Sequence, residues 1–194
     1  MGHIRQLSEN LANKIAAGEV VERPASVIKE LTENSIDAKA KSITILVEQG
    51  GTSSMSVIDD GIGMNRTDAL LCFSRHATSK IVDENDLFNI TTLGFRGEAI
   101  PSIASISVFT LETSDGEENT KVEYEFGKRK SVDSVAMNRG TKITVERIFQ
   151  NVPARLKYMK SINAEFAAIY SYVERLALAH PEIAFTLVLD HKTI

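Results

Sequence analysis

The sequence predicts an α+β fold: a two-layer sandwich with helices on one face of a mixed, mostly antiparallel sheet. Two observations predict it. Short strand-like stretches, separated by turn residues, follow one another through the middle of the chain. Two longer stretches, 24–38 and 164–179, have the apolar spacing of amphipathic helices. Packing such helices on a sheet buries the apolar sides of both.

The predicted elements follow in order along the chain. Pro24 suits the first position of a helix that runs to Ala38 and has Val27, Ile28 and Leu31 on one face. Strands are expected at 43–48, 54–59, 107–113, 121–126, 141–147 and 183–189. Short helices are expected at 68–73 and 97–104. In the helix 164–179, the side chains expected to face inward are Phe166, Ile169, Tyr170, Val173 and Leu176.

The size and composition indicate one intracellular domain. The chain has 194 residues, of which 43% are hydrophobic and 25% charged. We expect an N-terminal arm at 1–20 and a domain at 21–194, cut from a longer protein. No apolar run is long enough to span a bilayer, and no secretory leader is recognisable. The lone Cys72 excludes an internal disulfide.

Charge and histidine content limit the possible ligands. The net charge of −4 argues against nucleic-acid binding by the whole surface, but it leaves room for a basic patch at 155–160. Four histidines and one cysteine are scattered without zinc-site spacing. A metal, if used, would be a hard ion bound by oxygen ligands and a substrate phosphate.

The first long helix carries a polar stripe beside its apolar face. Relative to Leu31, Asn34 lies at about −60°, Glu30 at about −100° and Asp37 at about −120° around the helix. The opposite side is expected to carry Lys29 and Glu33. Spacing alone favours the polar margin of an ordinary amphipathic helix. The alternative is a carboxylate and an amide lining a cleft, as a base and a metal ligand do.

Three further stretches have two interpretations each. Asp59 ends a strand and is followed by Asp60-Gly61-Ile62-Gly63. This segment is either an ordinary turn or part of an adenine site. In an adenine site, the Asp59 carboxylate would accept a hydrogen bond from the amine, and the glycines would let a flat ring approach the backbone. The glycines of 94–97 precede a helix, as an anion site or a plain turn, without Walker A or dinucleotide spacing. The segment 75–80 offers cations and hydroxyls for phosphates, or is solvated surface.

The order of these pieces resembles the ATP-binding domain shared by gyrase, Hsp90 chaperones, sensor histidine kinases and MutL. The stretches LANKIAAGEVVERPASVIKELTENSIDA, RHATSKI, TLGFRGEAI and NVPARLKYMK are similar to the MutL family of DNA mismatch-repair proteins, and to its bacterial members in particular. The similarity runs from about residue 4 to the end of the chain.

This resemblance implies a Bergerat-type ATP-binding fold and a Mg²⁺-dependent ATPase. Glu30 would orient and deprotonate the attacking water, and Asn34 would ligate Mg²⁺. Asp59 would accept the adenine amine, with Gly63 and Thr141 completing the base pocket. The lid over the phosphates would consist of Thr78, Ser79, Lys80, Gly94, Phe95, Arg96 and Gly97. With the resemblance, catalysis becomes the favoured interpretation of the polar stripe.

The resemblance also implies a function for the longer protein. ATP would order the segment 75–97, two copies would associate, and slow hydrolysis would release them, coupling mismatch recognition to downstream repair. The implied partners are ATP or ADP, DNA, the mismatch-recognition protein MutS and a second copy, in the bacterial cytoplasm at the nucleoid. A lysine from the next domain lies outside the chain, so hydrolysis is expected of the full-length protein.

Two alternatives stay open. The first is a nucleotide-dependent docking module for DNA and repair proteins that does not turn over ATP, suggested by the basic segment 155–160. The second is a phosphotransfer kinase, which would need a phosphoacceptor histidine on a helix ahead of the domain. Only His3 precedes the candidate site, so the kinase is disfavoured.

Overall fold

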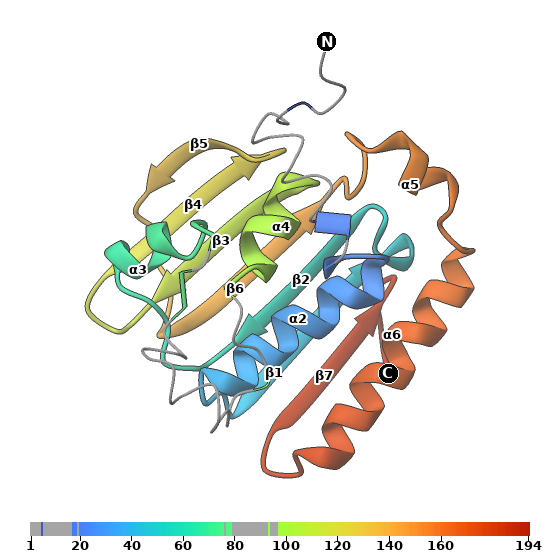
Figure 1. Ribbon diagram of the computed structural model, residues 1–194. Helices are drawn as coiled ribbons and strands as arrows, with labels where there is room; N and C mark the ends of the chain where they lie inside the picture. The colour runs from blue at the N-terminus through green and yellow to red at the C-terminus, as the bar shows by residue number, and fades with distance from the viewer. Residues whose placement is uncertain (1–4, 6–16, 19, 76, 79–92, 94–96) are drawn as a thin grey trace.

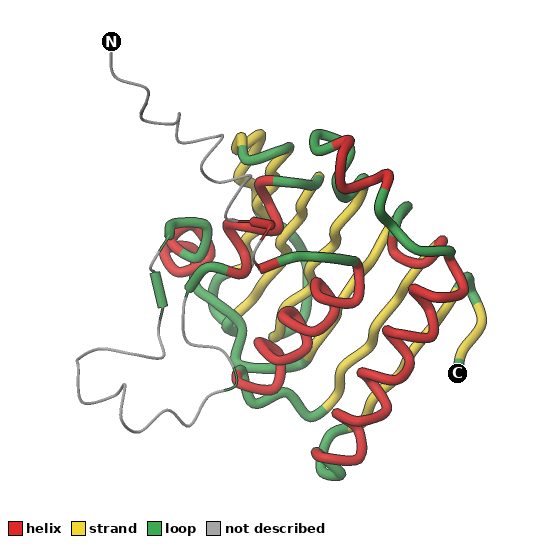
Figure 2. Tube along the Cα trace, turned by 45° about the vertical axis from the view of Figure 1, so that its right-hand side comes forward, coloured by secondary structure: helices red, strands yellow, loops and turns green. Residues whose placement is uncertain are grey.

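The computed structural model is a two-layer structure in which α2, α4 and α6 lie on one face of an eight-stranded sheet (Figure 1). The structure describes residues 5, 17–18, 20–75, 77–78, 93 and 97–194. Figure 2 shows the helical layer in front of the strands after a turn of 45°. This confirms the predicted fold class. A boundary between arm and domain at residue 20 stays a prediction, although Ala17 is fully buried in the core.

Most of the described elements match predicted ones, whereas the strands Lys128–Asp133 and Lys192–Thr193 were not predicted. In chain order they are α2 (Pro24–Asp37), β1 (Ser42–Glu48), the 3₁₀ turn η1 (Gln49–Gly51), β2 (Ser54–Asp59), α3 (Arg66–Leu71), α4 (Ala99–Ser105), β3 (Val108–Ser114), β4 (Asn119–Glu125), β5 (Lys128–Asp133), β6 (Gly140–Glu146), α5 (Pro153–Lys157), α6 (Ile162–Ala179), β7 (Ala184–Leu189) and β8 (Lys192–Thr193). The short helix expected at 68–73 starts earlier, because the Asn65 side chain accepts a hydrogen bond from the Asp68 amide and caps it.

The sheet order determines which loops meet. The strands lie in the order β5-β4-β3-β6-β2-β1-β7-β8, and β1–β7 is the parallel pair among antiparallel neighbours. β6 inserts between β2 and β3, so Thr141 lies opposite both Asp59 and Thr113. The end of β2 and the start of β6 therefore share one edge of the sheet.

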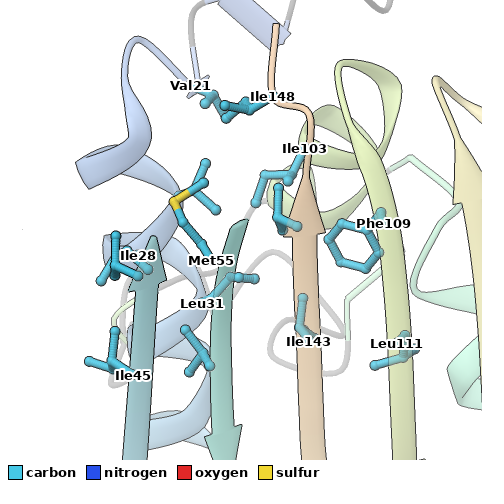
Figure 3. Packing of buried hydrophobic residues seen from close by; sticks show 14 of the residues in the cluster. Val21, Ile28, Leu31, Ile45, Met55, Ile103, Phe109, Leu111, Ile143 and Ile148 are labelled. Carbon is cyan, nitrogen blue, oxygen red and sulfur yellow. The ribbon is translucent and has the colours of Figure 1, made fainter. Parts of the chain in front are cut away.

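Helix α2 is buried on two sides. Pro24 occupies its first turn, and Val27, Ile28 and Leu31 are at most 1% exposed against the sheet. Figure 3 shows two of these side chains among those of β1 and β2. Glu33, predicted on the solvent side, is only 9% exposed. That prediction was wrong because α6 covers this flank.

Helix α6 packs along α2 and β7 near one end of the sheet (Figure 1). Its Ser161 cap accepts a hydrogen bond from the Ala164 amide, and Ile169 and Val173 are buried. Tyr170, predicted to face inward, is 42% exposed. A helix near the sheet edge buries a narrower stripe than one over its centre, so that prediction was wrong.

Candidate functional site

The polar stripe of α2 is half-buried, as its helical positions predict. Glu30, Asn34 and Asp37 are each partly covered, and the Glu30 side chain is 24% exposed. Lys29 Nζ lies 3.2 Å from Glu30 Oε1 and 3.4 Å from Glu33 Oε2. Burial opposes the charged form of Lys29, but these two carboxylates outweigh it and raise its pKa. Lys29 and Glu33 thus belong to the same helix as Glu30.

Asp59 lies at the end of β2, where it contacts α2. Its Oδ2 accepts a hydrogen bond from Ser35 Oγ at 2.7 Å, and its Oδ1 accepts one from the Gly61 amide at 2.9 Å. Burial raises the pKa of the Asp59 carboxyl, although these hydrogen bonds and one from Thr141 oppose the shift. The carboxylate is therefore fixed in place at an energetic cost.

Two threonine hydroxyls lie next to this carboxylate. Thr141 is 8% exposed, and its Oγ1 lies 3.1 Å from Thr113 Oγ1. Thr113 Oγ1 also accepts a hydrogen bond from the Met64 amide at 3.0 Å. This ties the loop after β2 to β3 and β6. The structure thus brings Asp59 and Thr141, two of the predicted site residues, side by side.

The glycines of the loop after β2 are required by the packing of the protein itself. Gly63 has φ +65°, and a Cβ there would lie 1.8 Å from the Ser114 carbonyl oxygen. A Cβ at Gly61 would lie 2.7 Å from the Ala38 carbonyl oxygen, at the end of α2. The loop therefore needs glycine at both positions whether or not a flat ring lies beside it.

The two segments predicted to contact phosphates approach each other. Gly97 has φ +61°, and a Cβ there would lie 2.4 Å from the Ala77 carbonyl oxygen, next to half-buried Thr78. The Leu93 amide donates to Asp37 Oδ1 at 3.1 Å, at the end of α2. The other predicted lid residues lie outside the described part of the chain: Ser79, Lys80, Gly94, Phe95 and Arg96.

The basic segment 155–160 divides into inward and outward residues. Arg155 Nη1 donates to the Val21 carbonyl oxygen at 2.5 Å, and its guanidinium lies 5.8 Å from the Phe149 ring centroid. Arg155 is thus a structural residue. Lys157 and Lys160 are exposed, so the predicted patch depends on lysines.

The described residues contain no ready-made metal cage and no membrane span. Within 20–75 and 97–194, no three His, Cys, Asp or Glu side chains gather to bind a metal ion. None of the described helices is long and apolar enough to cross a bilayer. Asn34 would give a hard ion one amide oxygen, which fits an ion whose other ligands come from a phosphate and water.

Sequence reasoning missed the residues that hold the site together. Three such residues were not predicted to take part: Ser35, Thr113 and Tyr172, whose hydroxyl donates a hydrogen bond to Glu33 Oε1. Ser35 gave a signal, because it lies at about +40° from Leu31 on the helix and so is a polar residue on the apolar face. For the other two, the sequence contains no comparable signal, since each depends on which element packs beside it.

The fold is that of a nucleotide-binding ATPase domain, and comparison with known proteins shows the same class. The chain belongs to the family of histidine kinase-, DNA gyrase B- and HSP90-like ATPases, whose model matches residues 22–158. Within this class it is similar to the DNA mismatch repair protein MutL. The identity is 56% over 194 residues for MutL of Lactococcus lactis subsp. lactis (strain IL1403) and 57% over 196 residues for MutL of Streptococcus thermophilus (strain ATCC BAA-491 / LMD-9).

These alignments cover 99% and 100% of this chain and 30% of each relative, so the chain spans about a third of their length. Among solved structures, the Aquifex aeolicus MutL ATPase domain complexed with ADP is 28% identical, with a TM-score of 0.70 over 90% of this chain and 62% of that one. The N-terminal domain of a DNA repair protein is 27% identical, with a TM-score of 0.79 over 94% of this chain and 54% of that one. The predicted resemblance is confirmed.

Proposed function

We propose that this chain binds ATP where the C-terminal half of α2 meets the edge formed by β2 and β6. In the whole protein it would be the ATP-driven switch of a mismatch-repair system. The observation that carries the proposal is Asp59, a half-buried carboxylate whose pKa is raised by burial and which accepts hydrogen bonds from Ser35, Gly61 and Thr141. Family membership and the ADP complex of a related domain support it.

Asp59 has the capacity to recognise adenine. The two carboxylate oxygens together have four lone-pair positions, and the hydrogen bonds from Ser35, Gly61 and Thr141 use three of them. An exocyclic amine can therefore still be accepted. Thr141 is the cross-strand neighbour of Asp59 and offers a hydroxyl to the same base, and Gly63 lies in the adjoining loop.

Hydrolysis would take place along the polar stripe of α2. Glu30 lies one helical turn before Asn34, so an acid for the water and an amide for the metal follow one another on one side of the helix. We assign Glu30 to orient the water and take its proton, and Asn34 to ligate Mg²⁺. The metal would neutralise phosphate charge when bound. The approach of Gly97 to Ala77 supports a lid built from 78–80 and 94–97.

In the whole protein, ATP binding would favour the association of two copies, and hydrolysis would release them. DNA and the mismatch-recognition protein MutS are the partners we propose, in the bacterial cytoplasm at the nucleoid. The support is similarity over this chain's whole length to proteins named for DNA mismatch repair.

The test uses the full-length protein. Glu30→Ala should abolish turnover while an ATP analogue still binds, because the base contacts water rather than the nucleotide. Asp59→Asn should weaken binding itself. Glu174→Ala, at an exposed acid on α6, is the control and should change neither. Full turnover in Glu30→Ala would show that Glu30 is not the base.

The second candidate function is a nucleotide-dependent docking module for DNA and repair proteins. Lys157 and Lys160 are exposed beside Tyr158, which is 88% exposed. Lys157→Glu should weaken DNA binding and reduce the slope of log affinity against log salt by about 1, because one phosphate contact is lost. Lys128→Glu, at an exposed lysine on the distant strand β5, is the control. Equal affinities in the two variants would exclude this patch as the DNA contact.

A further inference from the structure

A continuous series of polar contacts runs from α6 to Glu30. The Tyr172 hydroxyl donates to Glu33 Oε1 at 2.7 Å. The other oxygen of Glu33, Oε2, lies 3.4 Å from Lys29 Nζ, and Lys29 Nζ lies 3.2 Å from Glu30 Oε1. Helices α2 and α6 run side by side, so the series crosses the space between them (Figure 1).

The end of the series on α6 is firmly fixed. Glu33 is 9% exposed, and a carboxylate this buried needs hydrogen-bonding partners. Burial, together with the hydrogen bond to Glu33, raises the pKa of Tyr172 far above its usual range, so its hydroxyl keeps the proton that it donates. A phenol on a short, rigid side chain thus fixes the Glu33 carboxylate.

The end of the series at Glu30 would be mobile without this support. Lys29 is 47% exposed, and an exposed ion pair between adjacent residues contributes little by itself. Its i,i+4 partner Glu33 has the spacing that favours an ion pair on a helix. Because Glu33 is fixed, Lys29 is held on the side of the helix from which it reaches Glu30 Oε1.

We propose that Tyr172 is a positioning residue for ATP hydrolysis: it fixes Glu33, and through Lys29 it fixes the orientation of the Glu30 carboxylate. This inference rests on the proposed function, in which Glu30 is the base. Tyr172 acts on Glu30 through Glu33 and Lys29, without a contact of its own to Glu30 in this series. A base held in the wrong rotamer reacts slowly even when the nucleotide is bound correctly.

The experiment compares Tyr172→Phe with Tyr170→Phe in the full-length protein. Tyr170 lies on the same helix but is 42% exposed, so it controls for loss of a hydroxyl from α6. Tyr172→Phe should lower kcat roughly five- to fiftyfold and leave KM and the affinity for a non-hydrolysable ATP analogue within about twofold. Tyr170→Phe should match the wild type. If Tyr172 only joins α6 to α2, Tyr172→Phe would lower the melting temperature without lowering kcat. That result would overturn the proposal.

A second variant tests the route. Lys29→Met keeps the length of an exposed side chain but removes the charge that joins the two carboxylates. In that background, Tyr172→Phe should cause no further loss of kcat, because residues acting through one another are not additive. An undiminished effect would overturn the route through Lys29. Turnover retained in Glu30→Ala would refute Glu30 as the base, which is the part of the proposed function on which this inference rests. Turnover lost in Glu30→Ala, with Tyr172→Phe equal to the control, would refute the positioning role alone.

Discussion

Asp59→Asn separates nucleotide recognition from folding. Ser35 Oγ lies 2.7 Å from Asp59 Oδ2 and 3.2 Å from the Leu31 carbonyl oxygen, and its single proton cannot serve both acceptors fully. An asparagine amide in the same place can donate to Ser35 Oγ, which frees the serine proton for Leu31. The asparagine oxygen can still accept from the Gly61 amide. The variant therefore keeps the contacts with Ser35 and Gly61 and loses the charge of Asp59.

The expected loss of nucleotide affinity follows from that charge. Hydrogen bonds to ionised groups contribute about 1.5–3 kcal/mol, so replacing the carboxylate should weaken ADP binding roughly ten- to a hundredfold. The amine of adenine would meet an acceptor without charge or, in the other rotamer, a second donor. Titration calorimetry with ADP measures this loss directly.

The same substitution should make the nucleotide-free protein more resistant to heat at neutral pH. The pKa of Asp59 is raised by burial, so the folded state binds its proton more tightly than the unfolded state. The stability that this provides is present in acid and is lost as pH rises through the folded-state pKa. The substituted asparagine does not titrate and has no such loss, so the melting temperature of the variant relative to wild type should rise with pH.

The neighbouring residue gives a control of opposite sign. The Ser42 amide lowers the pKa of Asp60 most strongly, burial opposes this shift, and the Lys41 amide lowers the pKa further. Its stabilising contribution is present at neutral pH and lost as pH falls through the folded-state pKa. Asp60→Asn should therefore have a lower melting temperature than wild type at neutral pH, and this difference should disappear in acid. The variant should bind ADP normally. Wild-type ADP affinity in Asp59→Asn would refute the assignment of the adenine acceptor.

Three further predictions concern stability, measured by urea denaturation. Gly63→Ala should lower the free energy of unfolding by roughly 2–5 kcal/mol, because the new Cβ would collide with a backbone carbonyl at a residue with positive φ. At Gly116, with φ +101°, a Cβ would lie 3.9 Å from Arg139 Cδ, an ordinary contact, so Gly116→Ala should lower the free energy of unfolding by only about 1–2 kcal/mol. Arg23→Ala should cost about 3–5 kcal/mol, because it leaves the 1% exposed carboxylate of Glu165 without its ion-pair partner, and removing both side chains should cost less. Leu31→Ala should cost about 2–5 kcal/mol, since it empties a fully buried site under α2; a smaller loss would mean that the core collapses around it.

Periodicity predicted the elements that have one apolar and one polar side. Helix α2 and strands β1, β2 and β6 came within about two residues of their observed bounds, which is the usual uncertainty at element ends. Strand β5 (Lys128–Asp133) was missed because its text, KRKSVD, has no apolar alternation. It lies at the sheet edge, where exposed charge is favourable because it discourages pairing with other chains.

Within the candidate site, residues on one element were easier to predict than contacts between elements. The spacing of Glu30 and Asn34 located both on one side of α2, and the structure agrees. The predicted environment of Glu33 was wrong because a helical wheel describes one helix and cannot include a second helix packed along its polar side. Tyr172 was assigned no role for the same reason, as its partner lies far away in the sequence.

The sheet topology has a consequence for how the chain matures on the ribosome. α2, β1 and β2 emerge first, but their neighbours β6 and β7 emerge late, and Ser42 pairs with Ala184. Until then, both edges of the β1–β2 hairpin have unpaired backbone groups, together with the apolar side chains of Ile43 and Ile45. Such long-range pairing slows folding and leaves these edges open to aggregation. The helix that carries Glu30 and Asn34 therefore gains its contacts with α6 only late in translation, and we expect nascent chains that stall earlier to depend on chaperones.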